Sequence, residues 1–169
     1  MNTPFGKEDE MTGNAFQDYY ADEFASCFGC GRLNTHGLQI KSYWDGEESV
    51  CHFQPKPYHT GGYPGYVYGG LIACLIDCHG AATASATKSR ENGKEMDAHS
   101  PPRFVTASLH VDYLSPTPIN AILELRGKVK EIKGRKVIVA ITLSANDTVC
   151  VKGEVVAVQM PDDFLLKDK

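Results

Sequence analysis

The stretch YPGYVYGGLIACLIDCHGA, residues 63–81, consists almost entirely of apolar and small residues. From Gly69 onward it lacks the polar face that a surface helix carries. The pattern predicts a buried helix from about Gly69 to Lys88. One carboxylic acid, Asp77, interrupts the apolar sequence. Because a carboxylate is almost never buried without a partner, Asp77 has either a structural partner or a chemical role.

Alternating apolar and polar positions predict strands on both sides of this helix. The predicted strands occupy residues 38–44, 49–54, 104–114, 121–132, 136–144 and 149–160. A single helix cannot cover both faces of such a sheet. We therefore expect an α+β fold in which a curved antiparallel sheet of about six strands wraps around one long central helix.

The segment before the helix, PKPYHTGGYPGYVYGG at 55–70, predicts a loop. It holds five glycines, three prolines and four of the eight tyrosines of the chain. Such a loop lets the backbone approach a ligand closely, and its aromatic rings can line a pocket. The rest of the pattern predicts an N-terminal tail or short capping segment at 1–26, one domain at 27–161 and a C-terminal tail at 162–169.

Length and charge exclude several classes of protein. The 169 residues fit one domain, and the net charge of −4 comes with no basic stripe, so we expect no nucleic-acid partner. No apolar run is long enough to cross a membrane. The first residues lack the apolar core of a signal peptide, so the expected location is cytoplasmic.

The chain has six cysteines, which we expect to stay reduced in the cytoplasm. Cys27 and Cys30 form a CxxC pair in the segment CFGCG. A zinc site needs two further ligands, and the candidates Cys74, Cys78 and His79 fall on the predicted buried helix. We therefore expect a tight turn with small buried thiols, and no metal.

Four blocks of the sequence form a recognisable set. They are CFGCG…N…GL at 27–38, PGYVYGGLIACLID at 64–77, VTASLHVDYLSPTP at 105–118 and GRKVIVAITL at 134–143. Together they resemble the hotdog-fold acyl-CoA thioesterases, in the branch of the phenylacetate-pathway and mitochondrial acyl-CoA thioesterases. The resemblance implies the hotdog fold and hydrolysis of an acyl-CoA thioester without a metal or cofactor.

The resemblance also implies catalytic residues. In that family a His-Gly-Gly motif starts the helix, and an acid follows eight residues after the first glycine; Gly69 and Asp77 keep this spacing. The family's acid is the general base or nucleophile, and the amide of the first glycine donates to the oxyanion. A hydroxyl residue on the following strand, here Thr106, helps to hold the water or the acid.

The sequence departs from the family pattern at two places. Tyr68 stands where the family has histidine, and two glycines stand where it often has Asn, Gln or His. His59 is the nearby residue that can take the second role from a displaced position. We expect Tyr66, Tyr68, Gly70 and His59 to contact the substrate.

The spacing of Gly69 and Asp77 bears on the assembly. A helix start offers free N–H groups and a positive dipole end for an oxyanion. Eight residues of helix separate the two backbones by roughly 12 Å, whereas a reacting carbonyl must lie about 3 Å from both groups. The two groups must therefore come from different subunits. We expect a homodimer with antiparallel helices, alone or paired into a homotetramer.

Other interpretations remain open at this stage. Asp77 can be a buried acid that bonds Thr106, Tyr68 or backbone and does no chemistry. The protein can then be a binding protein that captures acyl-CoA without hydrolysing it. A hotdog-fold dehydratase or hydratase would need a histidine at position 68, and a structural zinc protein would be built on Cys27 and Cys30.

Overall fold

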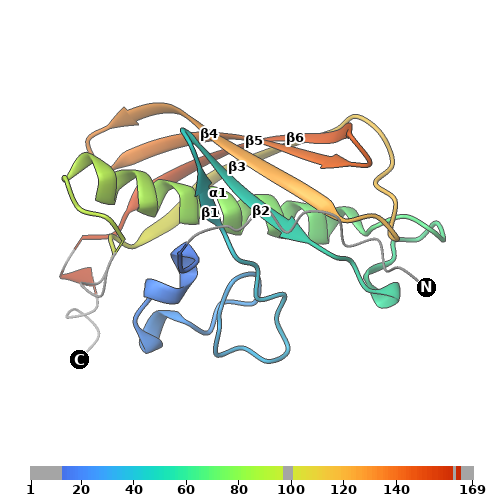
Figure 1. Cartoon of the computed structure of the whole chain (residues 1–169), viewed down its shortest axis with the longest axis horizontal. Coiled ribbons are helices and arrows are strands. Elements are labelled where there is room, and N and C mark those ends of the chain that lie inside the picture. The colour runs from blue at the N-terminus through green and yellow to red at the C-terminus, as the bar shows by residue number, and fades with distance from the viewer. Residues whose placement is uncertain (1–12, 97–100, 162, 165–169) are drawn as a thin grey trace.

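A six-stranded antiparallel sheet packs against one long helix in the computed structural model, which describes residues 13–96, 101–161, 163 and 164 (Figure 1). The strands are β1 (Tyr43–Asp45), β2 (Glu48–Phe53), β3 (Phe104–Tyr113), β4 (Leu123–Lys133), β5 (Lys136–Ala145) and β6 (Thr148–Gln159). The helices are α1 (Gly69–Glu91) and the 3-10 turns η1 (Phe16–Tyr19), η2 (Asp22–Phe24) and η3 (Pro57–His59). The strand order is β1-β2-β4-β5-β6-β3.

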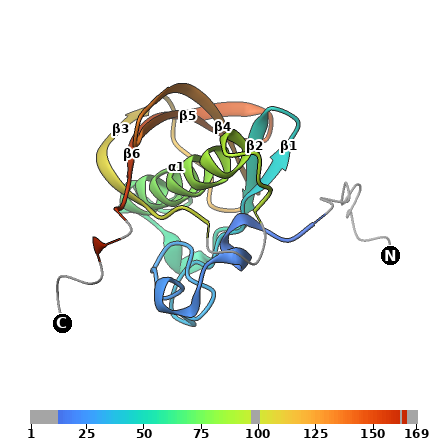
Figure 2. The ribbon, with the colours of Figure 1, turned by 90° about the vertical axis from the view of Figure 1, so that its left-hand side faces the viewer.

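The sheet curves over α1, as Figure 2 shows, and this confirms the hotdog architecture that the sequence predicted. Leu75 and Ile76 of α1 are fully buried against the sheet. At Gly80 a side chain would place its Cβ 2.5 Å from Cγ2 of Val155 on β6, so glycine permits a close approach of helix and sheet. This packing fixes the rotation of α1 about its own axis and therefore the direction in which the Asp77 side chain points.

The N-terminal segment covers the side of α1 that the sheet leaves open (Figure 2). Phe16 of η1 packs against Ala82 and Ala86 in a second apolar cluster. The sheet therefore covers one side of the helix and this segment covers part of the other, which accounts for most of its apolar residues. Residues 1–12 of the predicted tail lie outside the described residues, as do 162 and 165–169 of the predicted C-terminal tail. The domain bounds stay a prediction.

Two elements differ in length from their sequence-based predictions. The first strand is only Tyr43–Asp45, because residues 38–42 belong to a loop that folds back on the CxxC turn. In that loop the amide of Leu38 donates to the carbonyl of Phe28 at 2.8 Å. The helix runs three residues beyond Lys88. Within the described ranges, no helix combines the length and the hydropathy needed to cross a bilayer.

Strand β3 lies at one edge of the sheet and is exposed along most of its length. The alternation predicted for this strand is interrupted by a bulge between Thr106 and Ser108. Apolar side chains on it stay open to solvent: Val105 is 49% exposed and Tyr113 is 53% exposed. A long apolar edge strand of this kind is a surface on which a further strand can pair.

Candidate active site

The start of α1 presents two amides without a backbone partner. The carbonyl of Tyr68 accepts hydrogen bonds from the amides of Leu71 at 3.1 Å and Ile72 at 3.2 Å. In the described part of the chain, the amides of Gly69 and Gly70 donate to no backbone carbonyl. First-turn amides have no partner inside their own helix, and the helix dipole is positive there. The arrangement can hold a developing negative charge on a ligand oxygen.

The aromatic ring of Tyr68 lies next to Gly70. A Cβ at this position would lie 2.4 Å from Cε1 of the Tyr68 ring. Tyr68 itself precedes the helix in extended conformation and is 58% exposed. Its ring therefore lies over the second glycine of the helix start.

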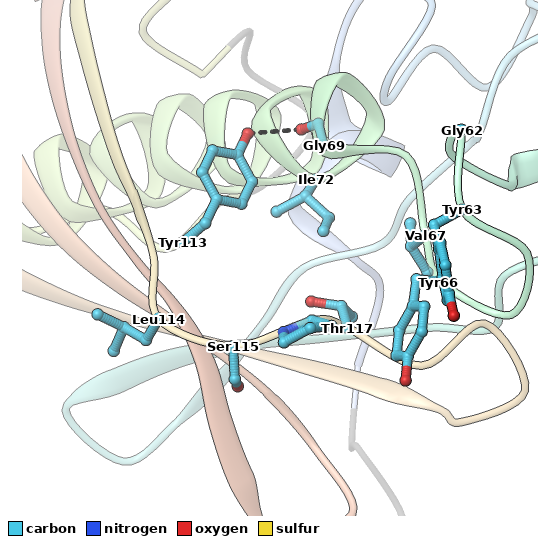
Figure 3. Close-up of a pocket in the computed structure, with 11 residues that line it drawn as sticks. Gly62, Tyr63, Tyr66, Val67, Gly69, Ile72, Tyr113, Leu114, Ser115 and Thr117 are labelled. Carbon is cyan, nitrogen blue, oxygen red and sulfur yellow. Dashed lines mark hydrogen bonds between the residues drawn. The ribbon is translucent and has the colours of Figure 1, made fainter.

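A cavity of about 660 Å³ opens beside the helix start (Figure 3). Its lining residues come from the Tyr-rich loop, the start of α1 and the segment after β3: Gly62, Tyr63, Tyr66, Val67, Gly69, Ile72, Tyr113, Leu114, Ser115, Pro116 and Thr117. Figure 3 shows the Tyr113 hydroxyl facing the Gly69 carbonyl, to which it donates at 2.6 Å. Of the substrate contacts expected from the sequence, Tyr66 lines this cavity, whereas Tyr68, Gly70 and His59 do not.

The segment after β3 adds two hydroxyl side chains to the wall of this cavity that were not predicted from the sequence. The hydroxyls of Ser115 and Thr117 are buried and have no hydrogen-bond partner among the described residues. A buried hydroxyl without a partner costs about 1–3 kcal/mol, so these two side chains lower the stability of this part of the fold. In the sequence these residues belong to SPTP, which indicated only the end of a strand.

Asp77 lies in the middle of α1, where its carboxylate meets β3. The Thr106 hydroxyl donates to Oδ1 of Asp77 at 2.5 Å, so the structure brings these two predicted residues together. Asp77 is only partly buried. The hydrogen bond fixes one carboxylate oxygen and leaves the other for water or substrate.

Within one chain, Asp77 and Gly69 face different cavities. Asp77 and Thr106 line a second cavity of about 150 Å³, and Asp77 is not part of the wall of the larger one. The helix start and the acid therefore do not converge inside a single chain. This agrees with the spacing of about 12 Å expected from eight residues of helix.

His59 is held by contacts within its own loop. Its Nδ1 accepts a hydrogen bond from the amide of Lys56 at 3.0 Å, and its ring stacks on Phe53 with 5.6 Å between centroids. Burial and the charge of Lys56 lower the pKa of His59. Its carbonyl accepts from the amide of Tyr68 at 2.9 Å, so the residue supports the backbone just before the helix.

The small cavity next to Asp77 is also lined by cysteine side chains. The Sγ atoms of Cys27, Cys30 and Cys78 all lie within 4.8 Å of one another. Cys27 is exposed, contrary to the expectation of buried thiols. Hydrogen bonds from the Cys30 and Cys78 thiols, together with the amides of Cys30 and Gly29, lower the pKa of Cys27 to about 2. The same contact with Cys27 raises the pKa of Cys30 to about 12.

Comparison with known families shows the family to which this chain belongs. The family described as thioesterase superfamily matches residues 64–152, which is more than half of the chain and includes both Gly69 and Asp77. A solved thioesterase superfamily protein from Shewanella loihica PV-4 is 51% identical, with a TM-score of 0.61. The match covers 76% of this chain and 96% of that protein.

Two curated relatives have names that state an activity. The acyl-coenzyme A thioesterase THEM4 of Xenopus laevis is 37% identical over 98 residues, which are 58% of this chain and 38% of that protein. The rat protein of the same name is 32% identical over 113 residues, which are 66% of this chain and 43% of the relative. This chain thus spans less than half the length of these two relatives.

Proposed function

Because this chain belongs to the thioesterase superfamily, we propose that it hydrolyses an acyl-CoA thioester to a carboxylic acid and CoA. The observation that carries the proposal is the pairing of two groups on one helix. The unpartnered amide of Gly69 starts α1, and Asp77, held by Thr106, follows eight residues later. The names of the relatives support acyl-CoA as the class of substrate.

In the proposed reaction Asp77 acts on the thioester carbonyl in one of two ways. As a general base it takes a proton from water, and the resulting hydroxide attacks the carbonyl carbon. As a nucleophile it attacks directly and forms a mixed anhydride, which water then hydrolyses. In both routes the tetrahedral oxyanion accepts a hydrogen bond from the Gly69 amide. The C–S bond then breaks, and the CoA sulfur leaves as thiolate and takes up a proton.

The proposed active unit is a homodimer, alone or paired into a tetramer. Two antiparallel α1 helices related by a two-fold axis bring Gly69 of one subunit to Asp77 of the other. The separate cavities of the single chain support this arrangement. So does the exposed apolar edge of β3, where Leu109 is 38% exposed and Val105 is 49% exposed. Pairing of β3 with its symmetry mate would satisfy the free edge and cover these side chains.

The cavity beside the helix start is the proposed acyl-CoA subsite. Tyr66 forms part of its wall, while Tyr68 and Gly70 flank the oxyanion amide and His59 supports the backbone before it. No cofactor takes part in this reaction, and the cytoplasmic location predicted from the sequence belongs to the same proposal. The acyl chain is not specified by these contacts.

One observation favours a second candidate, an acyl-CoA-binding protein that does not hydrolyse its ligand. Tyr68 replaces the histidine of the family motif and makes no side-chain hydrogen bond as the helix N-cap. A site that keeps the oxyanion amide but has lost this polar group can bind the thioester without turnover.

The experiment that separates the two candidates is thiol release from short, long and aromatic acyl-CoAs. Wild type is compared with Asp77→Asn and with Asp147→Asn, a matched control in the exposed β5–β6 turn whose φ of 61° suits asparagine. Loss of a general base costs about 10²–10⁴ in rate, so Asp77→Asn should be nearly inactive and Asp147→Asn unchanged. Binding without turnover in wild type would favour the second candidate.

A further inference from the structure

A cluster of thiols beside α1 has no part in the proposed hydrolysis. Cys27 and Cys30 come from the turn after η2, and Cys78 comes from the middle of α1, forty-eight residues later in the chain than Cys30. Their three Sγ atoms lie within 4.8 Å of one another. The fold therefore brings together a CxxC pair and a helix cysteine that the sequence analysis had placed in separate environments.

The spacing of the sulfur atoms fits a tetrahedral metal site. With Zn–S bonds of about 2.3 Å, two sulfurs of a zinc tetrahedron are separated by about 3.8 Å. The Sγ atoms of Cys27 and Cys78 are 3.7 Å apart. A disulfide would need a sulfur–sulfur distance of about 2.05 Å and would use only two of the converging thiols.

The turn that carries Cys27 and Cys30 is built to face the helix thiols. The amide of Gly31 closes this turn on the Cys27 carbonyl at 2.8 Å. A Cβ on Gly29 would lie 2.3 Å from the sulfur of Cys78, so only glycine leaves room for that thiol.

A fourth thiol lies one helical turn before Cys78. Cys74 and Cys78 are four residues apart and so lie on the same face of α1. The Cys74 sulfur itself lies outside the group of three whose Sγ atoms are within 4.8 Å of one another. A Cβ on Gly29 would also lie 3.0 Å from the Cys74 sulfur, which places Cys74 against the same turn.

A half-buried cation, Arg103, adjoins the thiols. Arg103 lines the same small cavity, and its guanidinium lies over the rings of Tyr20 at 4.3 Å and Phe24 at 4.4 Å. Its Nε is buried and has no hydrogen-bond partner among the described residues. A metal bound by three or four thiolates is negatively charged overall, and this guanidinium would offset part of that charge.

We propose that Cys27, Cys30 and Cys78 bind one Zn²⁺ ion and that Cys74, whose sulfur must move closer to the other three, is the fourth ligand. Soft thiolate ligands select Zn²⁺ over harder cations such as Mg²⁺, and four such ligands make a closed structural site. The ion links the turn at 27–30 to α1 through Cys78, which directly follows Asp77 in the chain. No metal was expected from the sequence, because Cys74 and Cys78 fall on a helix predicted to be buried, whereas in the structure the turn at 27–30 packs against the face that carries them.

The test is metal binding by the full chain, measured under reducing conditions and without reference to hydrolysis. We expect one tightly bound Zn²⁺ per chain by elemental analysis after gel filtration. Replacement with Co²⁺ should give the thiolate-to-cobalt charge-transfer absorption and intense visible bands of a tetrahedral thiolate site. Removal of the ion by a chelator should lower the melting temperature.

Variants assign the ligands. Because Cys27 is exposed, Cys27→Ser should still fold. Its affinity for zinc should fall by more than the roughly 10–100-fold that the loss of an outer-shell contact costs. Cys30→Ser and Cys78→Ser should do the same. Cys150→Ser, which removes a buried thiol outside the cluster, is the control and should bind zinc as wild type does. Unchanged affinity in Cys74→Ser would remove Cys74 from the ligand set.

Three results would overturn the proposal. The first is that the reduced protein takes up no stoichiometric metal and shows no charge-transfer band with Co²⁺. The second is that Cys27→Ser binds zinc as tightly as the Cys150→Ser control. The third is that mass spectrometry after alkylation finds Cys27 in a disulfide with Cys30 or Cys78 and that the protein still takes up no zinc after this disulfide is reduced.

Discussion

The buried histidine of α1 should make the stability of the protein depend on pH. His79 is fully buried, and its ring nitrogens lie 2.9 Å from the hydroxyl of Ser42 and 3.1 Å from that of Ser49. Ser42 in turn contacts the side-chain amide of Gln17, so the imidazole joins the N-terminal segment, β2 and the helix. No carboxylate takes part in these hydrogen bonds, so a protonated ring would be a buried charge without a counterion.

The size of the effect follows from the pKa of this group. Burial lowers the pKa of His79 from 6.5 to about 4. Because the unfolded chain binds the proton more readily, the stability is fully present above about pH 6.5 and is lost as the pH falls through about 4. One pKa unit is worth about 1.36 kcal/mol, so the whole effect is about 3.4 kcal/mol. Of this, about 2 kcal/mol should be lost between about pH 7.5 and about pH 5.

The assay is urea unfolding of wild type and His79→Gln at those two pH values. The decrease in unfolding free energy between them should be smaller in His79→Gln by about 2 kcal/mol, because glutamine does not titrate. His36→Gln, which removes an exposed imidazole, is the control and should keep the full decrease. An equal decrease in wild type and His79→Gln would refute the assignment of this pH dependence to the buried ring.

Three further changes test the packing and the cavity. Gly80→Ala places a methyl group 2.5 Å from Cγ2 of Val155 and should lower the free energy of unfolding, measured in urea, by about 1–3 kcal/mol. Gly62→Ala, where no atom lies within 4 Å of the added methyl group, is the control and should be nearly neutral. Thr117→Val removes an unpartnered buried hydroxyl, so it should leave the unfolding free energy in urea unchanged or raise it; a decrease of more than about 1 kcal/mol would mean that the hydroxyl has a partner. Tyr68→His restores the residue of the family motif and should keep or raise kcat, and a collapse of turnover would show that Tyr68 has a role of its own.

The sequence predicted the elements of the fold well because their signals are local. The apolar run after Gly69 and the alternation in the later strands depend on neighbouring residues, and all six strands and the helix are present. The first strand was predicted too long, since Leu38 and Ile40 pack and bond within a loop rather than in the sheet. A period of two in so short a segment does not separate a strand from an extended loop.

The candidate site was predicted in part, and the missing part depends on contacts between distant segments. The spacing of Gly69 and Asp77 is visible in the sequence, and Thr106 was suggested by the resemblance and lies against Asp77. The cavity wall formed by Ser115 and Thr117 was not predicted, because only the fold shows that the segment after β3 returns to the helix start. The convergence of the cysteines was missed for the same reason.

The central claim is that one thioester is hydrolysed by Asp77 of one subunit and the Gly69 amide of the other. Each group can be removed separately. Asp77→Asn removes the base or nucleophile. Gly69→Pro removes the amide N–H at the first helical position, which tolerates proline, and the extended Tyr68 before it is compatible with a following proline. Each variant alone should be nearly inactive.

The most direct measurement is the activity of a heterodimer that combines one Asp77→Asn subunit with one Gly69→Pro subunit, isolated with two different affinity tags. If the groups act across the interface, one of its two sites keeps both an intact amide and an intact carboxylate. The heterodimer should then regain about half of the wild-type kcat per dimer. A heterodimer as inactive as its two parent homodimers would contradict the account.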